Sequence, residues 1–378
     1  MVYTVPVTKV GPGTPAGQVL RQHWHPIGVS KDLEPGKARP LRILGEEFTL
    51  YRGRSSGKPF IVGSRCAHRY TWLHTGWVED DCIRCFYHGW KYDGDGQCVE
   101  MPAENEAFAK KIKIPHYRAV DYAGLIFGYF GDDEVPPPMW SFPQFDDPDN
   151  ELVSSIRPPG VWPMNYFQAL ENGVDPVHTA FVHSKSEPHW NGVPEVDGEE
   201  NPPDLPEGIQ ITATRADKEV RVTNYFFPNL SRITIYLVSG EDHQFNHYIW
   251  FVPIDDENTL MISNTVIPKR LVPEVPGFIK GAGRGWSENS HQDLMSANRG
   301  PESVTEEDYT AMVGQGRIAD RTNERLGRSD RVVIRLRQLW TRKIEALELR
   351  GAGVPDGALG EARPLSGRNE VPHNEPVS

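Results

Sequence analysis

Two short stretches carry the pattern that decides the fold of this chain: SRCAHRY at residues 64–70 and IRCFYHGW at residues 83–90. Each contains one cysteine and one histidine, spaced C-x-H in the first and C-x-x-H in the second. The chain has only 4 Cys and 13 His in 378 residues, so two such mixed pairs close together are not expected by chance. They predict a metal centre whose ligands are Cys66, His68, Cys85 and His88.

The mixing of ligand types distinguishes two kinds of centre. Structural zinc sites favour pairs of like ligands, as C-x₂₋₄-C and H-x₃₋₅-H. A Rieske [2Fe–2S] cluster instead needs two thiolates and two imidazoles, with both histidines on one of its irons. The sequence therefore favours a redox cluster over a zinc-stabilised binding module. Cys82 and Cys98 are left over, and we expect both to be ordinary buried thiols.

Composition limits the remaining classes. The chain has 40 basic and 52 acidic residues and a net charge of −12, which argues against nucleic-acid binding. It contains no apolar run long enough to span a membrane and no hydrophobic signal segment at its start. Few cysteines, two of them committed to iron, fit a reducing cytoplasm. A length of 378 residues predicts two domains.

Short apolar stretches separated by turn residues predict an all-β N-terminal domain, and a Pro/Asp-rich segment follows it. The second unit begins with a helical pattern at 163–184. Five antiparallel strands are then predicted between 209 and 267, with turns at Asp217–Lys218 and Asp255–Asn258, and helices at 302–315 and 331–348. The predicted divisions are an irregular arm (1–19, with a helix start at Thr14–Pro15), a cluster domain (20–135), a linker (136–162), a catalytic domain (163–350) and a flexible tail (351–378).

A second metal pattern occurs in the second unit. Asp175, His178 and His183 form D-x-x-H-x-x-x-x-H. Two histidines and one carboxylate on one face of a metal are typical of non-haem Fe(II) oxygenases. On a regular helix the two histidines would point about 140° apart, from about 100° per residue. We therefore expect the helix to end, kink or carry a π-type irregularity between them.

Together the two patterns resemble the catalytic α subunit of Rieske non-haem iron oxygenases over roughly residues 20–345. Within that family the chain looks most similar to the branch of phthalate and phenoxybenzoate dioxygenases and aromatic O-demethylases. The resemblance implies an α+β fold. Its N-terminal domain is an all-β Rieske domain, and its C-terminal domain is of the helix-grip (START-like) type with an antiparallel sheet.

The third iron ligand is implied by the resemblance, because the family carries a carboxylate seven residues before a glutamine. Asp308 stands in that position relative to Gln315. Asp293 and Glu307 remain as alternatives, and Thr305-x-x-Asp308 also fits a capping box at a helix start.

Asp175 is expected to support His178, because metal-bound imidazoles usually give their other N–H to a carboxylate. The resemblance further implies that Asp175 links His178 to His88 of a second copy of the chain. That arrangement requires a ring-shaped homo-oligomer, which for this branch is a trimer.

The strands after residue 209 are expected to line the substrate pocket. Aromatic side chains on them could equally be core residues of an alternating strand. Arginines there, Arg215, Arg221 and Arg232, could bind a substrate carboxylate through paired hydrogen bonds, or could be solvated strand residues. The predicted lining residues are Tyr225, Phe227, Tyr236, Phe245, Tyr248, Trp250 and Arg232, with Phe226 as a further candidate.

The predicted function is oxidation of an aromatic acid by O₂, either by O-demethylation of a methoxylated lignin-type compound or by ring hydroxylation. Electrons would pass from a [2Fe–2S] cluster to mononuclear Fe(II). The chain has no nicotinamide or flavin motif, so the resemblance implies a separate reductase, with or without a ferredoxin. The alternative is an electron carrier whose second domain only docks a partner.

Overall fold

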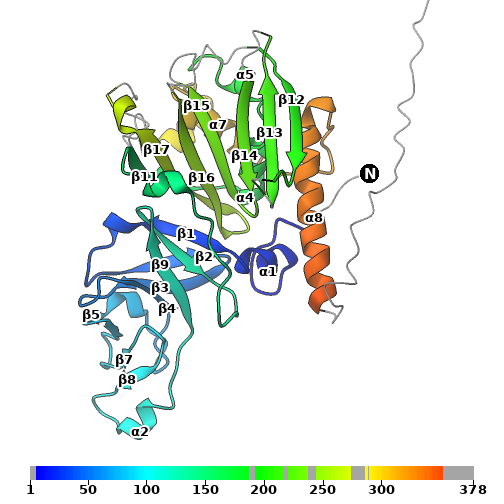
Figure 1. Ribbon diagram of the computed structural model, residues 1–378. Helices are drawn as coiled ribbons and strands as arrows, with labels where there is room; N and C mark the ends of the chain where they lie inside the picture. Colours follow the sequence, from blue (N-terminus) through cyan, green and yellow to red (C-terminus); the bar gives the residue numbers. More distant parts are fainter. Residues whose placement is uncertain are drawn as a thin grey trace, which may run out of the picture.

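The computed structural model describes residues 6–186, 192–203, 205, 207–216, 220–236, 244–273, 286–287 and 289–351. Within these residues the chain forms an N-terminal and a C-terminal unit, drawn one below the other in Figure 1. The predicted tail, except for its first residue, and the predicted turn at Asp217–Lys218 lie outside the described residues. None of the described helices is both long enough and apolar enough to cross a membrane.

The N-terminal unit is built from two antiparallel sheets, as predicted, with two short helices, α1 (Pro15–Arg21) and α2 (Glu106–Ala109). The larger sheet contains, in spatial order, β1 (Trp24–Val29), β10 (Leu125–Tyr129), β9 (His116–Tyr122), β4 (Pro59–Gly63), β3 (Glu46–Arg52) and β2 (Ala38–Ile43). The smaller sheet contains β5 (Trp77–Glu79), β6 (Cys82–Arg84), β7 (Lys91–Tyr92) and β8 (Cys98–Glu100).

The C-terminal unit is a seven-stranded antiparallel sheet with helices packed against it. The strand order is β11 (Asn150–Trp162), β17 (Asn258–Pro268), β16 (Gln244–Asp255), β15 (Leu230–Tyr236), β14 (Val220–Phe226), β13 (Gly208–Thr214) and β12 (Glu195–Glu200). The helices are α3 (Pro143–Asp146), α4 (Tyr166–Gly173), α5 (Thr179–Val182), α6 (Ser290–Met295), α7 (Val304–Val313) and α8 (Arg331–Gly351). The α+β fold class is therefore confirmed.

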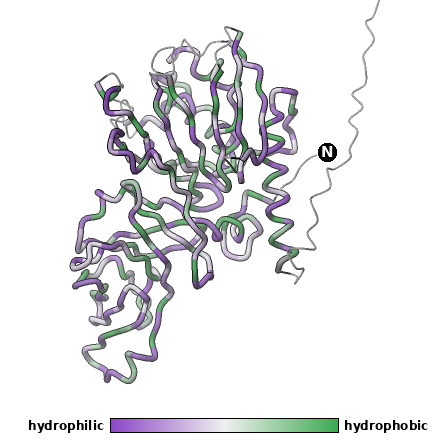
Figure 2. The backbone as a smooth tube through the Cα atoms, viewed as in Figure 1, coloured by the Kyte–Doolittle hydropathy of each residue, from purple (hydrophilic) through white to green (hydrophobic). Residues whose placement is uncertain are grey.

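Helix α8 closes one end of this sheet beside β12. Its buried residues recur every three or four positions, which puts them on one face of the helix, and hydrophilic and hydrophobic residues alternate along it in Figure 2. Trp340, at 0% exposure, packs its ring 4.9 Å from Phe227 and 5.8 Å from Phe167. The buried hydrophobic residues of α8 are Val332, Val333, Leu336, Leu339, Trp340 and Ile344.

The five strands predicted between 209 and 267 and the turn at Asp255–Asn258 are confirmed, but two further strands were missed. Residues 150–162, expected to belong to the linker, form β11, the edge strand paired with β17. The Pro158–Pro159–Gly160 run suggested a break in structure. The strand tolerates it because the pairing register shifts between Ile156 and Val161, leaving the run in a bulge. β12 was the second strand missed.

The N-terminal arm is also more ordered than expected. Val10 is fully buried, and its backbone N–H donates to Asp256 Oδ1 at 2.9 Å. Helix α1 begins where predicted, with the Thr14 hydroxyl accepting the N–H of Gly17 and proline as its first residue. Residues 6–14 form no helix or strand, as expected, but residues 6–19 pack against the C-terminal sheet instead of forming a free arm.

The two units are joined by backbone and side-chain contacts. At the β2–β3 turn, the N–H groups of Leu44 and Gly45 donate to the carbonyls of Pro253 and Ile254 in β16. Nearby, His25 of β1 is fully buried, with Nε2 2.8 Å from the Leu20 carbonyl and Nδ1 3.2 Å from Asn229 Nδ2. An imidazole that donates from Nε2 and accepts at Nδ1 is the neutral form.

Burial lowers the pKa of His25 to about 4. In the unfolded chain its pKa is about 6.5. Because protonation favours the unfolded chain, stability should fall as the pH drops from 6.5 towards 4, by about 2 kcal/mol at pH 5 relative to pH 8. Urea unfolding should show that His25→Gln has a lower unfolding free energy than the wild type at pH 8. Between pH 8 and pH 5 the unfolding free energy of the variant should fall by about 2 kcal/mol less than that of the wild type. Equal pH dependence in both proteins would contradict this assignment.

Candidate metal centres

The four predicted cluster ligands lie in two loops with matching backbone structure. In the first loop Cys66 N–H donates to the Thr71 carbonyl at 2.9 Å, and Tyr70 N–H donates to the Cys66 carbonyl at 3.0 Å. In the second loop, Cys85 to Trp90, the same two bonds recur at 2.8 and 3.0 Å, with Gly89 in the place of Tyr70.

Both equivalent residues have positive φ, 60° at Tyr70 and 74° at Gly89. At these two residues the chain reverses direction, and this reversal places the Cys and the His of each loop on the same side of that loop. The two loops therefore present one ligand pair each.

The loops bury the cysteines and expose the histidines. Cys66 is 0% and Cys85 2% exposed, whereas His68 and His88 are exposed, with ring centroids 4.4 Å apart. The hydrogen bond between the two sulfurs lowers the pKa of Cys66 to about 6 and raises that of Cys85. Two adjacent thiols under two adjacent imidazoles are the donor set that a Rieske cluster requires, so these residues fit the group.

Tyr92 adds a contact that the sequence analysis missed. Its hydroxyl lies 3.3 Å from Cys66 Sγ and accepts the N–H of Ala67 at 3.2 Å. A hydroxyl donating to a cluster sulfur stabilises the reduced, more negative state. We expect Tyr92→Phe to lower the reduction potential by about 40 mV, from ~1 kcal/mol for one hydrogen bond. Protein-film voltammetry measures this; an unchanged potential would show that the hydroxyl does not act on the sulfur.

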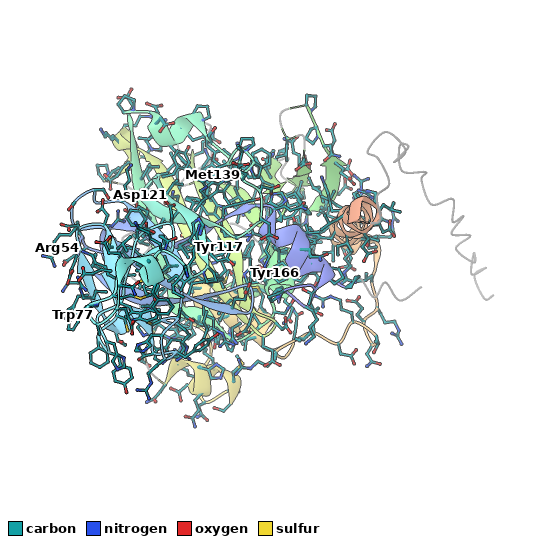
Figure 3. The ribbon with its side chains drawn as sticks, turned by 90° about the horizontal axis from the view of Figure 1, so that it is seen from below. Arg54, Trp77, Tyr117, Asp121, Met139 and Tyr166 are labelled. Carbon is teal, nitrogen blue, oxygen red and sulfur yellow. The ribbon has the colours of Figure 1, made fainter. Side chains whose placement is uncertain are left out.

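The two remaining cysteines differ from each other. Cys98 is buried at 1% exposure, as expected. Cys82 is only half-buried, which corrects the prediction of two buried thiols. It lies on β6, between β5 and β7 of the small four-stranded sheet. Trp77 on the adjacent β5 lies at the outer edge of the same unit in Figure 3 and is 53% exposed.

The second candidate centre is formed by helices of the C-terminal unit. Helix α4 ends at Gly173, and the four-residue helix α5 follows with His178 at its N-cap and His183 at its C-cap. The prediction that no continuous helix carries both histidines is confirmed, because α5 ends at Val182. Helix α7 lies beside α5 and supplies Asp308.

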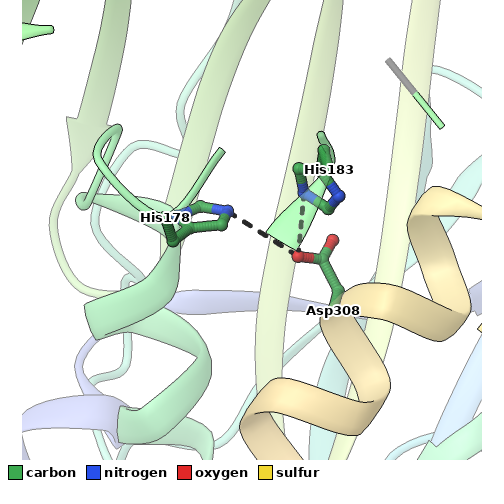
Figure 4. Close-up of side chains that lie close together, drawn as sticks. All are labelled: His178, His183 and Asp308. Atoms are coloured by element: carbon green, nitrogen blue, oxygen red, sulfur yellow. Dashed lines mark ion pairs between the residues drawn. The ribbon is translucent and has the colours of Figure 1, made fainter. Parts of the chain in front are cut away.

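Figure 4 shows both imidazoles pointing at the Asp308 carboxylate. Asp308 Oδ1 lies 3.2 Å from His183 Nε2 and 3.7 Å from His178 Nε2. This oxygen is buried and has no hydrogen bond of acceptable geometry. Burial by itself would raise the pKa of Asp308, but His183, together with Arg157 and His178, lowers it to about 2.

A buried, ionised oxygen without a donor, facing two imidazole nitrogens, is the environment expected where a cation binds. One oxygen of Asp308 and one nitrogen of each histidine lie within 4.8 Å of one another. Two histidines and one carboxylate match the donor set of a non-haem Fe(II) site, so these residues fit mononuclear iron.

The alternatives to Asp308 have other positions. Helix α7 is capped by Ser303, whose side chain accepts the N–H of Glu306, so Asp308 is not used as a capping residue. Asp293 lies in α6, and none of the contacts described for it reaches the two histidines. Asp308 stays our proposed third ligand.

Glu307 has a role that the sequence analysis did not assign. Its Oε2 atom lies 2.9 Å from His183 Nδ1 and accepts the Ser186 hydroxyl at 2.5 Å. It is 5% exposed. A carboxylate on the distal nitrogen fixes the tautomer of a metal-binding imidazole. Successive residues of α7 would therefore serve the metal and one of its histidines.

Asp175 does not support His178 in the predicted way. The partner of His178 Nδ1 is the backbone carbonyl of Asp175. The carboxylate of Asp175 instead accepts the N–H of Val177 at 2.8 Å. The aspartate side chain caps its own turn, as aspartates commonly do, and this leaves the main-chain carbonyl facing the ring. Within one chain the carboxylate is thus not bonded to the imidazole of His178.

Three predicted pocket residues lie on the wrong face of the sheet. Gly173 of α4 packs against Phe251 and Ser231, so the helices cover the face that carries those two side chains. Side chains of neighbouring residues in a strand point to opposite faces. The residues on the other face are Tyr248, Trp250 and Arg232; they contact Phe142, Phe127 and Asn224, respectively.

Of the other predicted pocket residues, Tyr225 and Phe245 are on the helix-covered face and Phe227 is in a loop. Phe226 shares the face of Trp250, because both pair with Leu230. Tyr225 bonds to Trp340 and Pro228, and Phe227 packs against Trp340 with tilted rings, so both are core residues here. Phe226 packs on Trp140 and Phe142. Phe245 packs with Ile267 and Leu271. The side chain of Tyr236 lies outside the described part of the chain.

Two of the three candidate arginines, Arg215 and Arg221, lie on the helix-covered face by register and alternation. Arg215 is 4% exposed, and its Nη2 donates to the Thr179 hydroxyl, next to His178, at 3.2 Å. Its Nε and Nη1 atoms are buried without a hydrogen-bond partner. Arg221 is 5% exposed.

Comparison with known proteins agrees with this architecture. A family model described as "Rieske [2Fe-2S] domain" matches residues 23–118. The chain is 31% identical to the 5,5'-dehydrodivanillate O-demethylase oxygenase subunit of a Sphingobium species, covering 95% of this chain and 84% of the relative. It is 30% identical to the phenoxybenzoate dioxygenase subunit alpha of Ectopseudomonas oleovorans, covering 92% and 87%.

The chain belongs to the oxygenase subunits of the Rieske non-haem iron oxygenases. A fluorene-bound oxygenase in the ferredoxin complex of carbazole 1,9a-dioxygenase superposes with a TM-score of 0.64 at 20% identity, covering 86% of this chain and 92% of that chain. This similarity shows the shared fold. The protein is thus an enzyme whose cofactors are a Rieske cluster and mononuclear iron.

Proposed function

We propose that this Rieske oxygenase subunit oxidises an aromatic carboxylic acid, by O-demethylation of a methoxylated lignin-type compound or by ring hydroxylation. The observation that carries the proposal is the convergence of His178, His183 and Asp308 on one point, on the side of the sheet that the helices cover. When bound, the cluster supplies single electrons and the mononuclear iron supplies the site of O₂ activation.

Each group of residues has a proposed role. Cys66, His68, Cys85 and His88 hold the cluster, and the two exposed imidazoles form its outward side. His178, His183 and Asp308 hold the iron, with Glu307 fixing the orientation of His183. A divided chain, with a cluster domain at 20–135 and a catalytic domain that includes the strand at 150–162 and runs to 350, separates electron entry from substrate oxidation.

Arg215 supports an acid as the substrate. A buried guanidinium needs an anionic or strong acceptor partner, and among the described residues Arg215 donates its hydrogen bond to the Thr179 hydroxyl rather than to a carboxylate. Its free Nε and Nη1 atoms could bind a carboxylate, and its Nη2 contact with Thr179 places it beside α5. The relatives named for dehydrodivanillate and phenoxybenzoate fit an aromatic acid.

The partners are proposed on the same basis. Exposed aromatic side chains surround the cluster loops, and such patches mark interaction sites. We assign this surface to a second copy of the chain, in a trimer, and to a reductase or ferredoxin; the carbazole dioxygenase complex contains a ferredoxin. The four cysteines form no disulfide, which fits the cytoplasm. The exposed residues are Tyr70, Trp77, Phe86 and Tyr87.

The test is a single turnover without added partners. Anaerobic protein is assayed for iron and sulfide, reduced chemically, and mixed with O₂ and vanillic acid or its methyl ester. About three iron and two sulfide per chain, with product and an equal amount of formaldehyde from the acid only, would support O-demethylation of an acid. Hydroxylated product without formaldehyde would support ring hydroxylation. Two iron and no product after Fe(II) is restored would favour an electron carrier.

Arg215→Met separates the acid-binding role from folding. It should raise the KM for vanillic acid about a hundredfold, since two charge-assisted hydrogen bonds are lost, while leaving the iron and sulfide content per chain unchanged. Arg232→Met, on the opposite face of the sheet, is the matched control and should change neither the KM for vanillic acid nor the iron content. Equal effects of both substitutions would contradict the assignment of Arg215.

A further inference from the structure

The two oxygens of Asp308 face different partners. Oδ1 points at the two imidazoles, 3.2 Å from His183 Nε2 and 3.7 Å from His178 Nε2. Oδ2 lies 3.4 Å from Nη2 of Arg157, a residue of β11. The carboxylate is thus divided between the metal-binding side and a guanidinium.

Arg157 is held in place by a second contact. The same Nη2 atom donates to the Thr305 hydroxyl at 3.1 Å, and Thr305 lies one helical turn before Asp308 on α7. The guanidinium also lies 5.8 Å from the ring of Trp162. With its side chain 18% exposed and that of Asp308 9% exposed, this pair is shielded from water. The contact therefore differs from a solvated surface ion pair.

We infer that Arg157 is a positioning residue that reserves Oδ2, so that Asp308 presents only Oδ1 to the iron. This inference rests on the proposed ligand set His178, His183 and Asp308. A carboxylate that gives one oxygen leaves more of the metal free for O₂ than a carboxylate that gives both. The positive charge of Arg157 also opposes the binding of a divalent cation, so the arrangement costs affinity.

The inference predicts a change that loss of structure would not produce. Arg157→Met frees Oδ2 and removes the opposing charge, so Co(II) should bind about tenfold more tightly, the size of change common for residues that contact metal ligands. Ordinary damage to the site would weaken binding. Arg157→Lys keeps the charge near Oδ2 and should restore most of the wild-type affinity. Arg232→Met, whose guanidinium bonds to Asn224 on the other sheet face, is the matched control.

The experiment uses the full chain with its cluster oxidised and its mononuclear site stripped of iron. Co(II) affinity is measured by chelator competition, and the Co(II) environment by electron paramagnetic resonance, in which an oxidised [2Fe–2S] cluster is silent. Arg157→Met should alter the Co(II) spectrum and raise the affinity. Thr305→Val removes the second anchor of Arg157 and should shift both readouts in the same direction by less, which keeps the test valid if the arginine variant fails to fold.

The outcomes separate this inference from the proposed site. The role of Arg157 would be overturned if Arg157→Met and Thr305→Val both left the Co(II) spectrum and affinity unchanged, or if both bound Co(II) more weakly. The ligand set would remain intact in either case. If His178→Ala binds Co(II) as tightly as the wild type, the ligand set itself fails, and the inference falls with it.

Discussion

Replacing His178 by alanine is expected to remove about one iron per chain and to abolish oxygenation while leaving about two iron and two sulfide in the cluster. His178 sits half-buried at the start of α5, where its ring packs against His183 at 5.4 Å rather than filling the main core. The substitution should therefore leave the fold intact. Two ligands, His183 and Asp308, would remain, and a two-ligand site does not retain Fe(II) during purification.

Metal and sulfide analysis with a single-turnover assay measures this prediction. His291→Ala is a suitable control, because His291 is exposed on α6 and contacts Tyr309 rather than the proposed ligands. The control should keep all of its iron. Full iron content in His178→Ala would refute the proposed mononuclear site and favour a protein that only carries electrons.

Asp175→Asn is expected to keep both metal centres yet to slow turnover about 10- to 100-fold. An asparagine oxygen can still accept the N–H of Val177, and the contact with His178 comes from the backbone, so neither the turn nor the imidazole should move. What the substitution removes is the negative charge of a half-buried carboxylate. If this carboxylate binds His88 of a second copy, the loss acts on electron transfer between the centres.

The measurement is the rate at which the reduced cluster is reoxidised in a single turnover, followed by stopped-flow absorbance. Arg321 and Glu171 form an ion pair at 2.7 Å in the same unit. Glu171→Gln is therefore a control for general disturbance of α4, and it should leave the reoxidation rate unchanged. A wild-type rate in Asp175→Asn would rule out the carboxylate as a bridge between the centres.

The local parts of both centres could be predicted from sequence, because each is contained within a few residues. A cluster loop needs only one Cys, one His and a residue that accepts positive φ, and all of these lie within Cys66–Thr71 or Cys85–Trp90. The break in the helix near His178 and His183 followed from the geometry of a helix alone. The family resemblance pointed to Asp308, 125 positions beyond His183, where spacing carried no information.

The tertiary structure alone decided which face of each strand meets the helices. Alternation divides Tyr248 and Trp250 from Phe251 but does not say which set is covered, so the predicted pocket included side chains that pack towards the N-terminal unit. The sequence analysis also assigned residues 150–162 to the linker, because a Pro-Pro-Gly run in an edge strand looks the same in sequence as a linker.

The contacts around the proposed iron ligands were likewise beyond the sequence. Glu307 reaches His183 across 124 positions, and Arg157 reaches Asp308 across 151. Such contacts depend on how α7 packs against α5 and β11, and packing is set by the whole sheet. The sequence thus determined which metals this protein can hold, since ligand chemistry is local. The fold decided how each ligand is oriented, because the partners that orient it come from distant parts of the chain.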